Sequence, residues 1–210
     1  MNQDEAIDLL IKRETNLLLA FPIKLYRVNI KDVSLELFHS IQYEIQKFEE
    51  SKKIKRFQQW PENIKTTFSY DRPNNIMRTG LLEKLNRFIY SESQKYYTEF
   101  EQNYKLKITS SWINLYEKND FQFRHTHLGD NNSVISGIYY HKTYPEGGEL
   151  VFYNPMSSTH KNNIVYDIYE IKPEDGDLLF FPSFLGHRVN PNLSNNIRKT
   201  ISFNMSQYEN

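Results

Sequence analysis

The stretch FQFRHTHLGDNNSVISGIYYHK, residues 121–142, decides how the rest of the chain is interpreted. Apolar and polar residues alternate in much of it, and this period of two is typical of a β-strand with one buried face. The polar run GDNN at 129–132 predicts a turn that divides the stretch into two strands. In the first strand His125 and His127 are two residues apart, so alternation places both imidazoles on the same face.

The period of two extends on both sides of this stretch, from about residue 106 to about residue 208. The strands predicted there are KITSSWINLYE, FQFRHTH, SVISGIYYHK, ELVFYN, IVYDIYEIK, DLLFFP, HRVNP and KTISFNMS. Gly147 with Gly148, and the run EDGD at 174–177, give the clearest turns between them. Eight short strands match a jelly roll of two packed four-stranded sheets, a cupin-like double-stranded β-helix.

The first 105 residues are expected to support this β-core with helices. Apolar residues recur at helical spacing at 4–19, 33–55 and about 78–103, and FPIKLYRVNI at 21–30 alternates like one early strand. The fold class predicted is α+β, mainly β, with helices packed on one sheet. At 210 residues we expect a single domain over 1–210.

Composition removes several classes of function. Lys plus Arg and Asp plus Glu number 26 each, so no net field attracts nucleic acid or an anionic membrane. The chain has no cysteine, which excludes disulfide scaffolds, thiolate metal sites and cysteine nucleophiles. The first residues, MNQDEAIDLLIKRETNLLLAF, are interrupted by charges and resemble neither a signal peptide nor a membrane span. We therefore expect a cytoplasmic protein.

A third histidine, His187 in FFPSFLGHRVNP, completes a candidate metal site with His125 and His127. Two ligands close in sequence and one remote ligand, with coordination positions left open, are typical of non-haem iron oxygenases. The alternative for any single histidine is a polar residue facing solvent. His39, His141 and His160 have no second candidate ligand at a similar spacing and are expected at the surface.

Arg198 in NNIRKTISFN is the candidate for binding a carboxylate. Its planar guanidinium can make two parallel hydrogen bonds to a carboxylate, which lysine cannot copy. On a strand it shares a face with Thr200, and Tyr140 could donate its hydroxyl to the same carboxylate or act only as a core aromatic residue. Asn114, which shares a strand face with Trp112, is a further candidate to line the co-substrate cavity.

These segments together resemble a known family. WINLYEKNDFQFRHTHLGDNNSVISGIYYHK, GGELVFYNP and KPEDGDLLFFPSFLGHRVNPNLSNNIRKTISFN are similar to the 2-oxoglutarate/Fe(II)-dependent oxygenases of marine bacteria and their phages, distant relatives of prolyl hydroxylases. The resemblance covers roughly residues 20–30 and 110–205. It implies that His125 and His187 are metal ligands, that Arg198 anchors the far carboxylate of 2-oxoglutarate, and that Tyr140 assists that arginine.

The sequence departs from the wider superfamily at His127, where an aspartate or glutamate is usual. A site of three histidines is the favoured interpretation. Two alternatives remain: Asp130, three residues further on, could supply the acidic ligand, or His127 could stay off the metal and leave water in its place.

The activity that the resemblance implies is hydroxylation of a C–H bond with Fe(II), 2-oxoglutarate and dioxygen. The primary substrate is a small molecule or a peptide, and the prolyl hydroxylases favour a peptide residue such as proline. The alternatives are a cupin-like metal or ligand-binding module without catalysis, and a three-histidine dioxygenase that does not use 2-oxoglutarate. Neither a membrane nor nucleic acid is indicated as a partner, a homodimer is left open, and a phage gene would place the protein in host cytoplasm.

Overall fold

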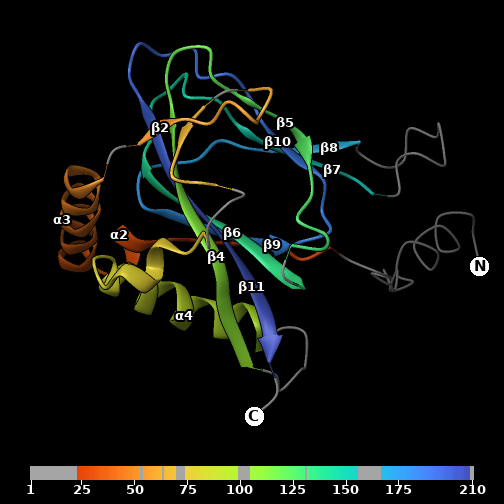
Figure 1. Ribbon diagram of the computed structural model, residues 1–210. Helices are drawn as coiled ribbons and strands as arrows, with labels where there is room; N and C mark the ends of the chain where they lie inside the picture. Colours follow the sequence, from red (N-terminus) through yellow and green to blue (C-terminus); the bar gives the residue numbers. More distant parts are fainter. Residues whose placement is uncertain are drawn as a thin grey trace, which may run out of the picture.

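Two antiparallel β-sheets lie face to face in this protein, and helices cover the outer face of the larger one (Figure 1). The computed structural model describes residues 23–52, 54–62, 64–69, 74–98, 105–130, 132–155 and 167–208. The expected fold class, mainly β with helices packed on one sheet, is confirmed. The helix expected at residues 4–19 lies outside the described residues. No helix among the described residues is long and apolar enough to cross a bilayer.

The eight strands expected after residue 105 form the core of both sheets. The larger sheet has the order β1-β9-β6-β11-β4-β3-β2, with bounds Tyr26–Asn29, Asp177–Pro182, Ser133–Lys142, Arg198–Tyr208, Lys105–Tyr116, Lys65–Thr66 and Lys55–Arg56. The smaller sheet has the order β5-β10-β7-β8, with bounds Gln122–His125, His187–Val189, Leu150–Tyr153 and Ile168–Ile171. The two four-stranded units β9-β6-β11-β4 and β5-β10-β7-β8 thus make up the jelly roll.

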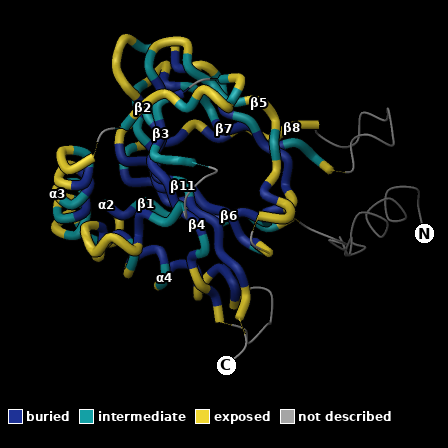
Figure 2. The backbone as a smooth tube through the Cα atoms, in the orientation of Figure 1, coloured by how far each residue is buried: buried dark blue, intermediate teal, exposed yellow. Residues whose placement is uncertain are grey.

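The register of β4, β11 and β6 determines which side chains enter the space between the sheets. Thr200 of β11 lies between Asn114 of β4 and Tyr140 of β6, so these three side chains share one face. Residues on this face, such as Tyr140 and Leu179, pack with Phe152 and Val189 of the smaller sheet. The strands in the middle of the larger sheet are buried along most of their length (Figure 2).

The opposite face of the larger sheet packs against the helices α2 (Ile30–Val33), α3 (Leu35–Ser51) and α4 (Glu83–Thr98). Helix α3 begins where the Ser34 side chain accepts a hydrogen bond from the Leu37 amide, and it buries Ile41, Ile45 and Phe48. Helix α4 buries Leu85, Phe88, Ile89, Tyr96 and Tyr97 at the same helical spacing. A short 3₁₀ helix, η1 (Ile76–Thr79), precedes α4.

The chain before residue 105 contains more strand than the sequence predicted. Besides the early strand β1, the strands β2 and β3 pair with each other and extend the larger sheet beside β4. Each has only two residues, which is too short for alternation to be visible in a sequence. Just after β3, Phe68 packs against Trp112 of β4.

We predict that Gly137→Ala destabilises the protein. A Cβ atom at Gly137 of β6 would lie 2.2 Å from Cζ of Phe203 and 2.7 Å from the carbonyl oxygen of Leu179. Overpacking of this kind typically costs about 1–3 kcal/mol. Urea unfolding should show a lower midpoint. Gly186→Ala is the matched control, because its Cβ would meet the flexible end of Arg124 at 3.1 Å. Equal midpoints in the two variants would contradict the prediction.

Candidate metal centre

Two neighbouring strands of the smaller sheet place His125 and His187 opposite each other. His125 is the last residue of β5 and His187 the first of β10, and the two are paired in the antiparallel register. His127 was expected on the same strand as His125 but lies just beyond the end of β5. Its backbone amide donates to the carbonyl of Ser183 at 2.9 Å, which holds this segment beside the loop that leads to His187.

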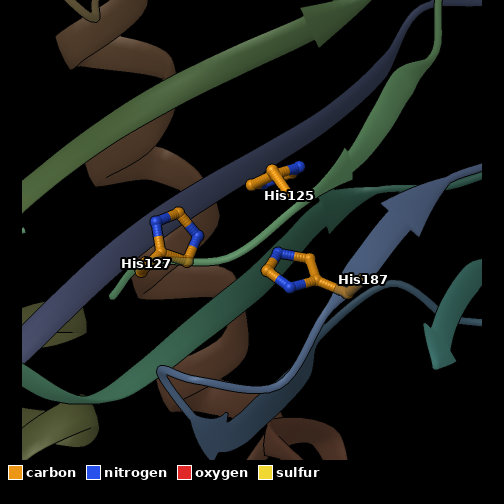
Figure 3. Close-up of side chains that lie close together, drawn as sticks. All are labelled: His125, His127 and His187. Atoms are coloured by element: carbon orange, nitrogen blue, oxygen red, sulfur yellow. The ribbon is translucent and has the colours of Figure 1, made fainter. Parts of the chain in front are cut away.

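The three imidazoles converge. Their ligating nitrogens lie within 4.8 Å of one another, and the ring centroids are separated by 4.3 Å for His125 and His187, 5.2 Å for His125 and His127, and 5.3 Å for His127 and His187. Figure 3 shows the three rings gathered around a common space. Burial first, and then the neighbouring imidazoles, lower the pKa values of His125 and His187. Both rings are therefore neutral near pH 7, the form that binds metals.

The second ring nitrogen of each histidine is held by an acceptor. Nδ1 of His125 lies 2.8 Å from the carbonyl oxygen of Phe123, and Nδ1 of His187 lies 3.0 Å from that of Leu185. Nδ1 of His127 lies 3.1 Å from Oδ2 of Asp130. Because carbonyl and carboxylate oxygens accept, Nδ1 is the donor in each ring, and in the neutral form of each ring Nε2 keeps its lone pair. All three rings are thus in the tautomer that a metal ligand requires.

Aromatic side chains surround the three histidines. The ring centroids of Phe181 and Phe152 lie 4.8 Å and 6.1 Å from that of His187, and the centroid of Trp112 lies 5.9 Å from that of His127. The indole nitrogen of Trp112 is buried and has no hydrogen-bond partner. Phe68 contacts Trp112 and comes from the segment that precedes the β-core. The site therefore has apolar walls, in which charge interactions are stronger than in water.

Arg198, the first residue of β11, is buried to 1% exposure in the same space between the sheets. Its guanidinium lies over the ring of Tyr116 at 3.9 Å, and its Nη1 donates to the carbonyl oxygen of Gly148 at 2.9 Å. Nε and Nη2 are buried and have no partner. Among the described residues no carboxylate pairs with Arg198, and burial lowers its pKa. The unpaired edge is the one that binds a carboxylate through two parallel hydrogen bonds.

In the larger sheet, Thr200 lies between Asn114 and Tyr140 on the neighbouring strands. Tyr140 is buried, which raises the pKa of its hydroxyl, and Arg198 acts on it electrostatically. It therefore remains a neutral donor close to the guanidinium. Asn114 donates its Nδ2 to Oγ of Ser202 at 3.3 Å, and its Oδ1 has no partner. Because the Ser202 hydroxyl can also donate, the Asn114 amide can turn over and present Nδ2 instead.

Three parts of this arrangement were not identified from the sequence. The carbonyl of Gly148 was noted only as part of a turn, yet it orients Arg198. Asp130 was considered as a metal ligand, but its carboxylate lies on Nδ1 of His127, the ring nitrogen away from a metal held by Nε2. Glu62 was not considered, and its Oε1 accepts the amide of Phe123 at 2.8 Å. The contacts of Gly148 and Glu62 join residues distant in sequence and leave no local motif, whereas that of Asp130 depends on the turn at Gly129.

The segment that holds the site also matches a known family. Residues 110–204 match the family described as "Putative 2OG-Fe(II) oxygenase", and this segment contains the three histidines and Arg198. Over these residues, a little under half of the chain, the β-core is similar to the 2OG-Fe(II) oxygenases. The resemblance inferred from the sequence is confirmed at the level of this family. No protein of curated function matches the chain by sequence.

Solved structures of two prolyl hydroxylases and of one α-ketoglutarate-dependent epimerase share the fold at low identity. A prolyl hydroxylase of Trichoplax adhaerens, in complex with a peptide of hypoxia inducible factor, is 15% identical with a TM-score of 0.61, over 87% of this chain and 83% of its own. A Pseudomonas putida prolyl-4-hydroxylase is 14% identical with a TM-score of 0.60, over 89% of this chain and 94% of its own. The α-ketoglutarate-dependent epimerase SnoN of nogalamycin biosynthesis is 10% identical with a TM-score of 0.64, over 96% of this chain and 83% of its own. Such identities establish the fold alone.

The remaining histidines differ from one another. His39 is exposed on α3, as expected, and His160 lies outside the described residues. His141 was expected at the surface but is buried to 7% exposure, because α3 covers this end of β6; Gln42 of α3 donates to its carbonyl oxygen. Burial, and then Lys199, lower the pKa of His141 to about 4. At pH values between about 4 and 6.5, His141 therefore binds a proton in the unfolded chain but not in the folded protein.

This difference predicts an acid-dependent loss of stability. Between pH 6.5 and pH 4, His141 should lower the free energy of unfolding as the pH falls, by about 3 kcal/mol in total. His141→Phe should lose correspondingly less stability across that window, measured by urea unfolding at pH 7 and pH 4. His39→Phe, at an exposed position, is the control and should follow the wild type. An unchanged pH slope in His141→Phe would disprove the assignment.

Proposed function

We propose that this protein is an Fe(II)- and 2-oxoglutarate-dependent dioxygenase in which His125, His127 and His187 bind the metal and Arg198, Tyr140 and Asn114 bind the co-substrate. The observation that carries the proposal is the buried Nε and Nη2 edge of Arg198, open in the same interior as three convergent histidines. An unpaired charge in such a place is costly unless a ligand of opposite charge joins it.

The donor set fits a first-row divalent ion such as Fe(II). Three imidazoles that each donate through Nδ1 can offer Nε2 to such an ion, and an open site leaves positions for further ligands. Because none of the three ligand atoms is anionic, the ligands themselves would not neutralise any of the positive charge of a bound metal. That charge favours chelation by the anionic end of 2-oxoglutarate, while the guanidinium of Arg198 suits its far carboxylate.

The protein's own residues bind, orient and exclude water. Arg198 is held by Gly148 and Tyr116 before any ligand arrives, so little side-chain entropy is lost when a carboxylate binds. Tyr140 stays protonated and donates its hydroxyl to the same carboxylate. The aromatic walls formed by Phe152, Phe181 and Trp112 keep water away from the metal side. With 2-oxoglutarate and dioxygen, the bound iron supplies oxidative decarboxylation to succinate coupled to hydroxylation of a C–H bond.

For the primary substrate we propose a peptide or protein residue such as proline. The support is the common fold with two prolyl hydroxylases, one of which was solved with a peptide. Hydroxylation of synthetic proline-containing peptides, followed by mass spectrometry for a gain of one oxygen atom, tests this choice. A small-molecule substrate remains the alternative, and the common fold with SnoN supports it. For the setting, we propose the cytoplasm, host cytoplasm if the gene comes from a phage, and a homodimer.

Binding of 2-oxoglutarate should depend on Arg198. Anaerobic titration of the Fe(II)-loaded protein with 2-oxoglutarate should produce a visible metal-to-ligand charge-transfer band. Arg198→Lys keeps the charge but loses the fork, so the dissociation constant should rise about tenfold or more. Arg188→Lys is the control, because Arg188 follows His187 on β10 and points to the other face of the sheet.

The same titration separates the proposal from its alternatives. A binding module without catalysis, or a three-histidine dioxygenase that does not use 2-oxoglutarate, gives no such band. Absence of the band in the intact protein would refute the proposed function. A dissociation constant unchanged in Arg198→Lys would refute the role of Arg198.

Metal retention should depend on His187. We expect His187→Ala to lose iron, measured by elemental analysis after anaerobic loading and desalting, because its imidazole is the ligand from the other strand. His127→Asp should retain iron, since a carboxylate oxygen is also a ligand for Fe(II). His39→Ala, at an exposed position on α3, should match the wild type. Full iron content in folded His187→Ala, checked by circular dichroism, would contradict the assignment.

A further inference from the structure

The three histidines differ in what holds their Nδ1 atoms. His187 is held by the neutral carbonyl of Leu185, whereas His127 contacts the carboxylate of Asp130 directly. His125 is held by the carbonyl of Phe123, and the amide nitrogen of the same residue donates to the carboxylate of Glu62 at 2.8 Å. Two carboxylates therefore lie just outside a ligand set that itself contains none. The proposed function gives neither of them a role.

Asp130 is brought back to His127 by a tight turn. Gly129 adopts a φ of +86°, in the left-handed region that favours glycine, and the amide of Asp130 donates to the carbonyl of His127 at 3.2 Å. On its other side, the carbonyl of Asp130 accepts the amide of Ser133 at 3.0 Å and also the Ser133 hydroxyl. The backbone of Asp130 is thus fixed at both ends. Its carboxylate reaches Nδ1 of His127 from a position that cannot at the same time reach a metal on Nε2.

Glu62 lies in the segment between β2 and β3. It binds the Phe123 amide and acts electrostatically on His125. Because the Phe123 carbonyl also accepts from Nδ1 of His125, one residue connects the carboxylate to the imidazole. This path is longer than the direct contact of Asp130, so its influence on the ring should be weaker.

We propose that Asp130 is a positioning residue that returns, through His127, the negative charge that the third ligand lacks. The inference rests on the proposed metal site. A carboxylate on Nδ1–H orients the ring and increases the basicity of Nε2, which strengthens the bond to a metal. Glu62 acts in the same sense on His125 through the peptide. The negative charge that an aspartate or glutamate ligand would place on the metal is here on the Asp130 carboxylate, which contacts His127 instead. The metal site is therefore less positive than its three ligand atoms alone suggest.

The test is cobalt binding by the full-length protein under anaerobic conditions, with Co(II) alone as the probe. Asp130→Asn keeps a hydrogen-bond acceptor but removes the charge, and Asp130→Ala removes both. Outer partners of metal ligands typically contribute 10- to 100-fold in metal affinity, and the Asp130 side chain is 54% exposed. We therefore expect the dissociation constant to rise about tenfold in Asp130→Asn, near the lower end of that range. It should rise further in Asp130→Ala, and Asp130→Glu should recover most of the loss.

Two further measurements distinguish a charge effect from simple loss of structure. The visible d–d bands of the Co(II) protein should shift in Asp130→Asn, because the donor strength of His127 changes. Glu62→Gln should shift the bands and the dissociation constant in the same direction but by less. Asp32→Asn, an exposed carboxylate at the start of helix α2, is the control and should match the wild type in both. Circular dichroism verifies the fold of each variant.

The outcomes separate this inference from the proposed function. If the wild-type protein does not bind Co(II), the proposed metal site itself is wrong. If the wild type binds and Asp130→Asn has the same dissociation constant and the same bands, the inference about charge is overturned, even where Asp130→Ala binds weakly. A shift in both quantities in Asp130→Asn, reversed in Asp130→Glu, supports it.

Discussion

The guanidinium of Arg198, buried between two sheets without a carboxylate partner, is the constraint on which the rest of the structure depends. Removing such a charge from water costs several kcal/mol, and one carbonyl and one aromatic ring offset only part of it. The fold nevertheless holds the guanidinium with Nε and Nη2 without a hydrogen-bond partner. In the proposed function, the far carboxylate of 2-oxoglutarate would supply the missing partner of this guanidinium.

The two sheets divide the work of building this interior. The smaller sheet supplies the metal side, because the pairing of β5 with β10 sets His125 opposite His187. The larger sheet supplies the side proposed for the co-substrate, because the register of β4, β11 and β6 places Asn114, Thr200 and Tyr140 on the face that also carries Arg198. Short segments outside the β-core then adjust the chemistry: Glu62 and Asp130 bring carboxylates to the outer side of the histidines.

Local patterns were sufficient for the β-core and for singling out the three histidines that the structure brings together. Alternation marked the eight strands after residue 105, and the spacing of His125 from His127 suggested a shared ligand role. The predictions that failed or were left open depend on the tertiary structure. His141 shares a strand face with the buried residues Ile135 and Tyr139, and helix α3 covers that face. The two-residue strands β2 and β3 have no period to detect, and Asp130 could not be assigned to either nitrogen of His127 before the turn at Gly129 was known.

The most direct test of the central claim is X-ray absorption spectroscopy at the iron edge of the anaerobic Fe(II)-loaded protein, with and without 2-oxoglutarate. The account predicts the multiple-scattering pattern of three imidazole ligands in both samples, with oxygen ligands added or exchanged when 2-oxoglutarate binds. A centre with fewer than two imidazoles, or one whose spectrum does not change with 2-oxoglutarate, would contradict it.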